Sequence, residues 1–373
     1  MVFSIDDGRP VRGQRRTWEM LDGMAAELRD RIEDALVAFL EPARAEIEAI
    51  GAELEPLAEA AADTVLGGGK RLRPAFCYWG ARAAGRADDD ALVRAAASLE
   101  LLHACALVHD DVIDRSATRR GSSSAHERFA QLHSEHHWRG DPAEFGRATA
   151  ILLGDLLLVW SDAMFAASGL DPTALARARP VAERMRTELM AGQYLDIVEQ
   201  ARGGGSVERA LRVARYKAAT YTVEGPLHLG AAIGDAQPDT IEALSAYGVP
   251  LGEAFQLRDD LLGAFGDPDV TGKPAGDDLR EGKRTVLIAL TLEAASPTGR
   301  ALLERDLGNP NLDDDGVSAL LDVVSATGAV KTIEHLITTR LAAAIDALAT
   351  ADIDSEARVA LVQLASAATR RDG

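Results

Sequence analysis

The stretch LVRAAASLELLHACALVHDDVIDRS, residues 92–116, is an unbroken run of helix-forming residues whose end carries three aspartates. Alanine and leucine are among the strongest helix formers, so the run predicts a long, buried helix. Around that helix Asp110 and Asp114 lie about 40° apart and Asp111 about 100° from Asp110, so all three side chains can address one cleft. Like charges at this spacing destabilise a helix, and a hard divalent cation would remove the cost.

The rest of the chain has the same helical character. Apolar residues at three- and four-residue spacing predict two or three helices over residues 18–65, interrupted near Pro42 and Pro56. Further helices are expected over residues 146–167, 174–199, 206–233 and 240–265, and in pieces over 285–371. Strand-like alternation and a repeat of roughly 20 to 50 residues are both missing. We therefore predict an all-α protein, with a flexible leader over residues 1–16 and one helical bundle around a central cavity over residues 17–373.

Composition narrows the classes of function. The formal charge, 40 − 59 = −19, argues against nucleic-acid binding and against docking on anionic lipid. Cys77 and Cys105 lie in apolar helical segments and are expected to be reduced core residues. The polar N-terminus lacks a signal-peptide core, and no run approaches the roughly 20 apolar residues of a membrane span. We expect a cytoplasmic protein without stable membrane insertion.

The first aspartate cluster suits a metal-bound phosphate ligand. Oxygen-only ligation favours Mg²⁺ over zinc, and Mg²⁺ commonly takes one or two carboxylates together with water and substrate phosphate. Arg119 and Arg120 follow closely, and their guanidinium groups match phosphate oxygens. For this fragment alone, a solvated face of salt bridges is an equally simple interpretation.

A second acidic segment, FQLRDDLLGAFGDPDVTGKPAGDDLREGKRT at residues 255–285, shifts the balance toward a site. An apolar helix again carries paired aspartates, and a Gly-rich loop with further charges follows. In chain order its polar residues of interest are Gln256, Asp259, Asp260, Lys273, Asp277, Asp278 and Lys283. A calcium loop beginning at Asp267 competes with this interpretation, but Lys273 and Pro274 break that pattern and Asp278 replaces its bidentate glutamate.

A third segment, GGGKRLRP at residues 67–74, places Lys70, Arg71 and Arg73 after three glycines, which leaves room for an anion among several cations. It is not a P-loop, because the GxxxxGK[ST] spacing and a preceding strand are missing. Alone it also fits a helix end with basic caps. Together, two acidic helices and two basic segments indicate two diphosphate-bearing substrates, one of them held through metal.

In this order the motifs resemble the trans-isoprenyl diphosphate synthases of the polyprenyl synthetase family, bacterial geranylgeranyl diphosphate synthases among them. The resemblance covers about residues 67–285. It rests on GGKRLRP, DDVID with its trailing RRG, LGD at residues 153–155, GQYLD at 192–196, Lys217 in RYKAATYT, and the second aspartate-rich motif. It implies the helical isoprenoid synthase fold, a homodimer, and a prenyltransferase that condenses isopentenyl diphosphate with C5 to C15 allylic diphosphates.

The resemblance also implies a role for each site residue. The metal set, for about three Mg²⁺ ions that Mn²⁺ can replace, comprises Asp110, Asp111, Asp114, Asp259 and Asp260, with Asp196 and Asp278 acting through water. The residues expected to bind the allylic diphosphate are Arg119, Lys217 and Lys273, and Lys283 is a further substrate-binding residue. The isopentenyl diphosphate site is matched by Lys70, Arg73, His103 and Arg120, and Gln256 lines the reacting carbons. The catalytic set is then Asp110, Asp114, Lys217, Gln256, Asp259 and Lys273.

Physical chemistry agrees with this transfer. Ionising an allylic C–O bond requires stabilisation of the leaving pyrophosphate, which metal ions and fixed cations provide without a protein nucleophile. Three positions depart from the family pattern: Gly263 stands where a third aspartate is often found, Ala218 where a threonine is common, and Ser123 where a proline is common. From Gly263 we expect weakened rather than lost metal binding.

Product length is expected to depend on the residues just before the first aspartate. In the family the product tail runs along this helix, and bulky side chains four and five positions earlier form a floor. Here Ala106 and Cys105 are small, so the tail can pass one more turn, about 5.4 Å, until Leu101 and Leu102. We therefore predict geranylgeranyl diphosphate as the main product, with farnesyl and C25 to C30 diphosphates as alternatives.

Two other functions are compatible with parts of the pattern. A class I terpene cyclase would share the metals and the allylic site but would not need Lys70, Arg73 and His103. A non-catalytic subunit of a two-component synthase would be expected to lose an acidic motif, whereas both are largely present here.

Overall fold

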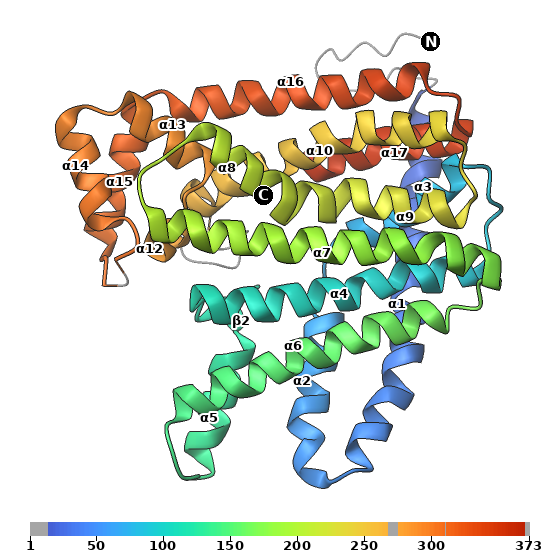
Figure 1. The fold of residues 1–373 in the computed structure, drawn as a ribbon, viewed down its shortest axis with the longest axis horizontal. Coiled ribbons are helices and arrows are strands. Elements are labelled where there is room, and N and C mark those ends of the chain that lie inside the picture. The colour runs from blue at the N-terminus through green and yellow to red at the C-terminus, as the bar shows by residue number, and fades with distance from the viewer. Residues whose placement is uncertain (1–13, 268–274, 310, 370–373) are drawn as a thin grey trace.

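The computed structural model describes residues 14–267, 275–309 and 311–369, and helices form nearly all of it (Figure 1). Within these ranges strand occurs only in a short antiparallel hairpin, β1 (Thr118–Arg119) with β2 (Ser122–Ser123). The all-α prediction is confirmed. Residues 1–13 of the predicted leader lie outside the described residues, but residues 14–16 already belong to the first helix. The single-domain assignment over residues 17–373 stays a prediction.

The N-terminal half supplies the long helices that carry the first acidic motif. Its elements are α1 (Gln14–Glu48), η1 (Ala52–Leu54), α2 (Glu55–Leu66), α3 (Leu72–Ala83), α4 (Asp90–Asp114), α5 (Ala125–Glu135), α6 (Pro142–Ala166) and α7 (Pro172–Arg202). The C-terminal half supplies the second acidic motif. Its elements are α8 (Val207–Val213), η2 (Ala214–Glu224), α9 (Gly225–Ile233), α10 (Pro238–Phe265), α12 (Asp277–Glu281), α13 (Val286–Ala294), α14 (Pro297–Asp306), α15 (Asp314–Ala326), α16 (Ala329–Thr350) and α17 (Ser355–Thr369).

The predicted break near Pro42 is wrong, because Pro42 lies inside α1. A proline in a helix interior costs about 3 kcal/mol. Packing offsets that cost here, since Leu36, Leu40 and Ala43 on the same helix are buried against the core. The helix ends instead just before Gly51.

Aspartate side chains fix the starts of three long helices, two of which, α4 and α7, carry residues of the site. Asp89 accepts a hydrogen bond from the backbone N–H of Leu92 at 2.7 Å at the start of α4. Asp141 and Asp171 cap α6 and α7 in the same way, each followed by a proline in the first turn. These caps place the helix starts two to four residues before the predicted ones (90 against 92, 142 against 146, 172 against 174).

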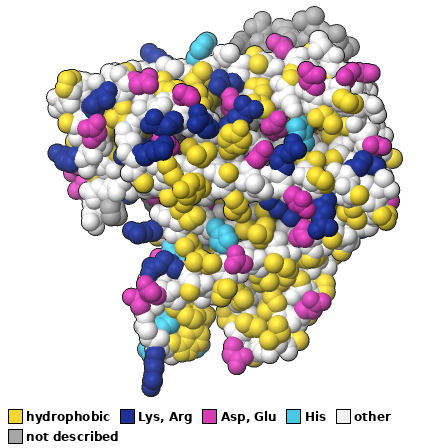
Figure 2. All heavy atoms as spheres, in the orientation of Figure 1, with side chains coloured by type: hydrophobic (Ala, Val, Ile, Leu, Met, Phe, Trp, Pro, Cys, Tyr) yellow, Lys and Arg dark blue, Asp and Glu magenta, His cyan; other side chains and the backbone are white. Residues whose placement is uncertain are grey.

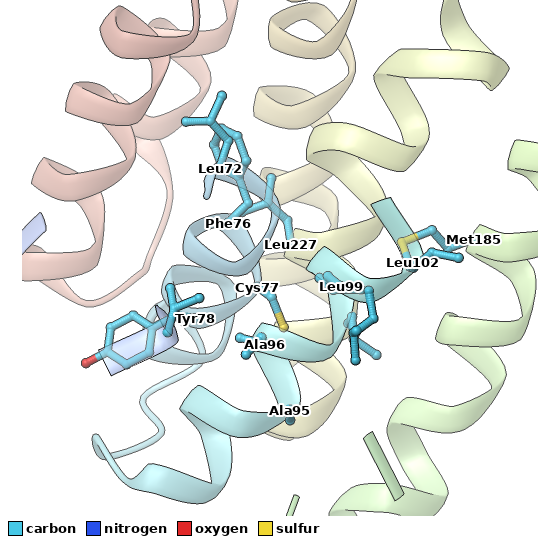
Figure 3. Close-up of a cluster of buried hydrophobic side chains, with 14 of the residues drawn as sticks. Leu72, Phe76, Cys77, Tyr78, Ala95, Ala96, Leu99, Leu102, Met185 and Leu227 are labelled. Carbon is cyan, nitrogen blue, oxygen red and sulfur yellow. The ribbon is translucent and has the colours of Figure 1, made fainter. Parts of the chain in front are cut away.

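Two hydrophobic clusters form the core. The larger one joins α1, α3, α4, α6, α7 and α9, and Figure 3 shows part of it, where Phe76 and Cys77 of α3 lie near Ala96 and Leu99 of α4 and Leu227 of α9. The smaller one joins α8 and α12–α16. Helices α10 and α16 contribute side chains to both clusters. The two acidic motifs are thus carried by helices that the core holds rigidly. Cys77 and Cys105 are both buried free thiols, as predicted.

The sequence predicts no segment apolar enough to span a membrane, but two helices of the structure pass such a test. By length and composition alone α4 and α6 are apolar enough to cross a membrane, and α15 with α16, bent by 64°, also passes as a pair. Within the protein, however, 72% of the apolar window of α4 and 44% of that of α6 are buried. The apolar character of α4 is therefore used for packing, whereas α6 keeps part of its apolar surface outside.

That exposed apolar surface continues from α6 onto α7. Figure 2 shows hydrophobic side chains gathered on the lower part of the face across which α6 and α7 run in Figure 1. The large exposed hydrophobic residues on these two helices, here called the α6–α7 patch, are Ile151, Leu152, Val159, Met190, Tyr194 and Ile197. Several large exposed apolar side chains on two neighbouring elements of one face are typical of a surface that another protein covers.

Candidate active site

The first acidic wall is the last turn of α4. Asp110 accepts a hydrogen bond from the amide nitrogen of Gln193 at 2.9 Å and lies 3.1 Å from the ammonium group of Lys217. Burial alone would raise the pKa of Asp110, but the charges of Lys217, Lys283 and Arg119 outweigh it and hold that pKa below its ordinary range. Asp110 is therefore a partly buried, ionised carboxylate.

Asp114, one turn further along α4, connects the first acidic wall to the second. Its Oδ2 lies 3.3 Å from the ammonium nitrogen of Lys283, which also donates to Oδ1 of Asp278 at 3.1 Å. Burial and the negative charges of Asp110 and Glu281 raise the pKa of Asp114 to about 6, although Lys283 acts against this. Carboxylates from both acidic motifs thus share one cation and face each other across one cleft.

The second acidic wall lies on α10. Asp260 is 5% exposed and accepts a hydrogen bond from Nε2 of Gln256 at 2.7 Å. Burial raises its pKa to about 8, and repulsion from Asp278 and Asp259 adds to this, although the hydrogen bond from Gln256 acts against it. The assignment of Asp260 to the metal set stays a prediction. Asp259 lies about 100° from Asp260 around the helix, and its role as a metal ligand also stays a prediction.

A π-helix presents Lys217 to the acidic cleft. Residues 214–224 form the π-helix η2, whose wider turns are frequent at functional sites. The ammonium group of Lys217 donates to Oδ2 of Asp196 on α7 at 2.6 Å and also contacts Asp110. A Cβ atom at Gly192 would lie 2.3 Å from the backbone nitrogen of Lys217, so only glycine lets α7 approach η2 this closely. This contact gives the GQYLD motif a structural reason.

Asp111 does not join the metal-facing set, contrary to the prediction. Its side chain is 3% exposed, and its Oδ1 accepts hydrogen bonds from Nε of Arg119 at 2.9 Å and from Nη2 of the same guanidinium. The approximately 100° offset from Asp110 turns Asp111 to another face of α4. There it positions Arg119, whose Nη2 lies 3.7 Å from Asp110.

A cationic cluster lies beside the acidic cleft. Arg73 donates from Nη2 to Thr222 at 2.9 Å and stacks 4.4 Å over the ring of Tyr221. Nδ1 of His103 lies 3.0 Å from the hydroxyl of Tyr221. Nε of Arg73 is buried, and no described residue accepts a hydrogen bond from it. Such a donor in a group of cations suits an anionic ligand.

The hairpin after α4 brings Arg120 to the Gly-rich loop. Nη1 of Arg120 donates to the carbonyl of Gly68 at 2.6 Å, which joins segments 52 residues apart in sequence. Burial lowers the pKa of Arg120, and the positive charges of Arg71, Arg119 and Arg73 lower it further. Lys70 follows this loop and donates to the carbonyl of Ala367 on α17 at 3.3 Å. The predicted isopentenyl diphosphate residues are therefore grouped in one region.

Arg71 is not part of that cationic site, contrary to the sequence expectation. Its backbone is left-handed, with φ of 50°, and its side chain turns into the core. There Nη1 donates to Glu100 at 2.7 Å, and Nε and Nη2 form a fork onto Glu33 at 2.8 and 3.0 Å. Arg71 is thus a buried ion-pair residue that fastens α1 and α4 to the start of α3.

The residues expected to limit product length differ in how far they are buried on α4. Leu101, Leu102 and Cys105 are 0% exposed, and Sγ of Cys105 lies 3.8 Å from Nδ1 of His109. Ala106 is only partly buried and packs at the edge of the larger core cluster. Of the two predicted floor residues, Ala106 is the accessible one.

The carboxylates of the acidic cleft are ligands that fit Mg²⁺, and in this structure two lysines supply the positive charge between them. Among residues 14–267, 275–309 and 311–369, no group of three carboxylate, imidazole or thiolate side chains is arranged to hold a metal unaided. Lys217 instead bridges Asp110 and Asp196, and Lys283 bridges Asp114 and Asp278. Carboxylate oxygens held around a positive charge are the ligands that Mg²⁺ takes when a substrate phosphate completes its shell. Lys273, the remaining predicted phosphate ligand, lies outside the described residues.

Some site residues were not singled out by the sequence. Gln193 holds Asp110, Tyr221 joins Arg73 to His103, and Glu281 accepts from Ser116 and lies 2.5 Å from the ammonium of Lys283. Gln193 lies within the GQYLD motif and was readable there. Tyr221 and Glu281 gave no signal in the sequence, because their roles depend on the π-helix and on the loop that returns to α4.

Known proteins are similar to this chain over most of its length. The polyprenyl synthetase family model matches residues 55–324. The chain is 34% identical over 263 residues to the (2E,6E)-farnesyl diphosphate synthase of Mycobacterium bovis, covering 70% of this chain and 68% of that one. It is 30% identical over 277 residues to the geranylgeranyl diphosphate synthase of Saccharolobus solfataricus, covering 74% and 78%. Geranylgeranyl pyrophosphate synthase from Corynebacterium glutamicum, in a crystal structure complexed with isoprenyl diphosphate and magnesium, superposes with a TM-score of 0.90 at 42% identity, covering 93% and 99%.

The helical fold, the facing acidic walls and these similarities define a trans-prenyltransferase. The chain belongs to the polyprenyl synthetase family.

The state of His103 leads to a prediction about pH. Burial holds the pKa of His103 well below its usual value, and the charges of Arg73, Arg120 and Arg119 lower it further. Below about pH 6.5 the unfolded chain therefore binds one more proton at this residue than the folded protein. The free energy of unfolding should fall as the pH drops from about 6.5, by up to about 1.4 kcal/mol per pH unit for this group.

His103→Gln removes this titration and keeps a polar side chain beside Tyr221. Urea unfolding between about pH 5 and pH 7.5 should show a shallower loss of stability on acidification for the variant than for the unsubstituted protein. Parallel stability curves for the two proteins would contradict a neutral His103 with a lowered pKa.

Proposed function

We propose that this prenyltransferase makes geranylgeranyl diphosphate by successive condensation of isopentenyl diphosphate with C5 to C15 allylic diphosphates, with Mg²⁺ as its cofactor. The observation that carries the proposal is the position of Lys283, whose ammonium lies 3.3 Å from Asp114 and 3.1 Å from Asp278. Because the two carboxylates come from the two acidic motifs, a diphosphate between them would meet both walls at once.

The chain's own residues have distinct tasks in this reaction. Mg²⁺ held by Asp110 and Asp114 on one side and Asp259 on the other would stabilise charge on the leaving pyrophosphate. Lys217 is a fixed cation, because nearby Asp110 and Asp196 raise its pKa above the ordinary value despite burial, which would lower it. Lys217, with Arg119, would bind and orient the allylic diphosphate. Ionisation then needs no protein nucleophile.

The second substrate would lie against the cationic cluster. Arg73, His103 and Arg120 lie in a region where like charges already destabilise one another, so a diphosphate would relieve that repulsion. Lys70, beside the Gly-rich loop that Arg120 contacts, would add a further cation. This placement would bring isopentenyl diphosphate next to the acidic cleft, so that its double bond would be close to the allylic carbon. A terpene cyclase would have no use for this second site.

Product length is the finer part of the proposal. The relatives include both a farnesyl and a geranylgeranyl diphosphate synthase, so chain length must be argued from the floor of the tail path. Ala106 is small and accessible, whereas Cys105, Leu101 and Leu102 are enclosed. A tail that passes Ala106 would stop against the enclosed leucines about one helical turn earlier on α4, which supports a C20 product.

Product sizing tests the proposed function directly. Purified protein with Mg²⁺ and labelled isopentenyl diphosphate should extend C5, C10 and C15 primers and accumulate a C20 diphosphate. A main product of C15, or of C25 and longer, would refute the chain-length assignment. Hydrocarbon formed from an allylic diphosphate alone would indicate a cyclase, and no turnover with any primer would indicate a non-catalytic subunit.

Ala106→Phe should shorten the product. A phenyl ring at this accessible position would block the tail path one turn sooner, so the main product should change from C20 to C15 with the same primers. Ala104→Phe is not a suitable control, because Ala104 is 2% exposed and the ring would disrupt the core.

Ala106→Gly is the better control, since it leaves the tail path open and the main product should remain the C20 diphosphate. An unchanged product length in Ala106→Phe would place the floor on another helix.

We further propose that the enzyme is a cytoplasmic homodimer whose interface includes the α6–α7 patch. Val159 and Tyr194 in this patch are 63% and 67% exposed, which is unusual for large apolar side chains in an isolated protein. Analytical ultracentrifugation should give the mass of two chains. Val159→Glu, which places a charge in the patch, should shift the mass toward one chain, and a monomeric starting protein would refute the proposal.

A further inference from the structure

Gly263 occupies a position where glycine has no conformational purpose. It lies inside α10, in ordinary helical backbone, where glycine is less favourable than alanine by about 1 kcal/mol. It follows Asp259 by four residues and therefore lies on the same face of the helix, toward the acidic cleft. A glycine kept at such a position needs a reason in its surroundings.

The surroundings supply that reason through one side chain. A Cβ atom at position 263 would lie 1.8 Å from Oδ2 and 2.5 Å from Cγ of Asp278, and the third nearest atom, at 3.1 Å, is Oδ1 of the same carboxylate. The carboxylate of Asp278 therefore rests on the bare backbone of α10. Any side chain at position 263 would push it away.

Asp278 is held in this place from the other side. Its Oδ1 accepts a hydrogen bond from Lys283 at 3.1 Å, and its backbone carbonyl accepts one from the backbone N–H of Lys283 at 3.0 Å. Lys283 in turn reaches Asp114 on the opposite wall. The carboxylate of Asp278 is thus fixed one helical turn beyond Asp259, at the place on α10 where an aspartate at position 263 would project.

We propose that Gly263 and Asp278 form a matched pair, in which the absent side chain at position 263 lets Asp278 supply the third carboxylate of the second acidic wall. The inference rests on the proposed metal-assisted function and corrects one expectation from the sequence. Gly263 does not weaken the metal site, because the carboxylate it lacks is delivered by Asp278. Asp278 supports the metal site with its carboxylate, and glycine at position 263 leaves the space that this carboxylate occupies.

A double-substitution cycle tests the pair through binding rather than turnover. Mg²⁺ binding would be measured by calorimetry in the presence of inorganic pyrophosphate. Gly263→Ala and Asp278→Ala should each weaken it about 10-fold, the lower end of the effect expected for residues that support metal ligands. The double variant should be no weaker than either single variant, because both changes remove the same carboxylate. Gly263→Asp/Asp278→Ala should restore binding to within about threefold, since it returns a carboxylate to α10.

Gly23→Ala is the matched control. Gly23 is also inside a helix, and a Cβ atom there would meet no atom within 4 Å, so this variant should bind Mg²⁺ and pyrophosphate like the unsubstituted protein. If Gly263→Ala behaves like Gly23→Ala, or if the two single effects add in the double variant, the proposed pairing is wrong.

Thermal unfolding without metal separates a failure of this inference from a failure of the proposed function. In the Asp278→Ala background, Gly263→Ala should raise the melting temperature by about 2 °C, because the helix gains alanine without a clash. In the unsubstituted background the displaced carboxylate should cancel that gain. One outcome would be that the gain in melting temperature differs between the two backgrounds while the unsubstituted protein does not bind Mg²⁺. That outcome would refute the metal-assisted function and the metal role of Asp278. An equal gain in both backgrounds would refute the pairing itself.

Discussion

Asp110→Asn is expected to lower kcat/KM by about 10²- to 10³-fold, the range seen when one preorganised electrostatic group is removed from an active site. The substitution keeps the size of the side chain and removes its charge. Lys217 would keep Asp196 as a partner at 2.6 Å, so the lysine stays in place while the first acidic wall loses its central carboxylate. Incorporation of labelled isopentenyl diphosphate with Mg²⁺ measures the loss.

Asp162→Asn provides the control for that loss. Asp162 is an exposed aspartate that pairs with Arg186 at 2.8 Å on the outside of the bundle, so its variant should keep the activity of the unsubstituted enzyme. Turnover by Asp110→Asn within a few-fold of the unsubstituted enzyme would mean that Asp110 does not hold the metal.

Arg71→Met is expected to lower the free energy of unfolding by about 3–5 kcal/mol, the usual cost of removing one partner from a buried ion pair. The side chains of Arg71 and Glu100 are 2% and 4% exposed, so the variant leaves the Glu100 carboxylate buried without its cation. Urea unfolding measures the change. Arg71→Met/Glu100→Met should recover most of the loss, because an apolar pair of similar volume carries no desolvation cost. A single variant as stable as the unsubstituted protein would contradict a buried pair.

Arg73→Met, two residues further along, should have the opposite profile. Arg73 contacts the hydroxyl of Thr222 and the ring of Tyr221 but no carboxylate among the described residues, so folding depends on it much less. The KM for isopentenyl diphosphate should rise about 10- to 100-fold, as expected for the loss of a charge-assisted hydrogen bond. The KM for the allylic substrate should change little. Equal effects on both KM values would mean that Arg73 does not bind isopentenyl diphosphate specifically.

The fold was largely predictable, and its misjudged boundaries have local causes. The helix α4 could be predicted from its long apolar run, because alanine and leucine favour helix and fill the core. The starts of α6 and α7 were placed too late although Asp141-Pro142 and Asp171-Pro172 are readable caps. The break at Pro42 was wrong because burial of the flanking residues, which a sequence pattern does not measure, outweighs the local cost of proline.

The site was predictable as a set of residues but not as a set of contacts. Asp110 and Asp114 were identified because their spacing on one helix is fixed by helix geometry. Arg71 and Arg73 look equivalent in the sequence, and only the left-handed backbone at Arg71 sends one into the core and leaves the other at the site. The π-helix around Lys217 could not be predicted, because its wider turns are decided by packing between η2, α7 and α10 rather than by local propensity.

The double use of Lys217 and Lys283 has a consequence for how the cleft accepts its ligands. Before any substrate enters, each ammonium group serves as counterion to carboxylates on two chain segments. A diphosphate bound with Mg²⁺ would offer the lysines phosphate oxygens in exchange for carboxylate oxygens, so neither ammonium group would lose all of its anionic partners. Binding and release of the diphosphate would then be exchanges of ionic partners by the two lysines. At no stage would a charge in the cleft be left without a counterion.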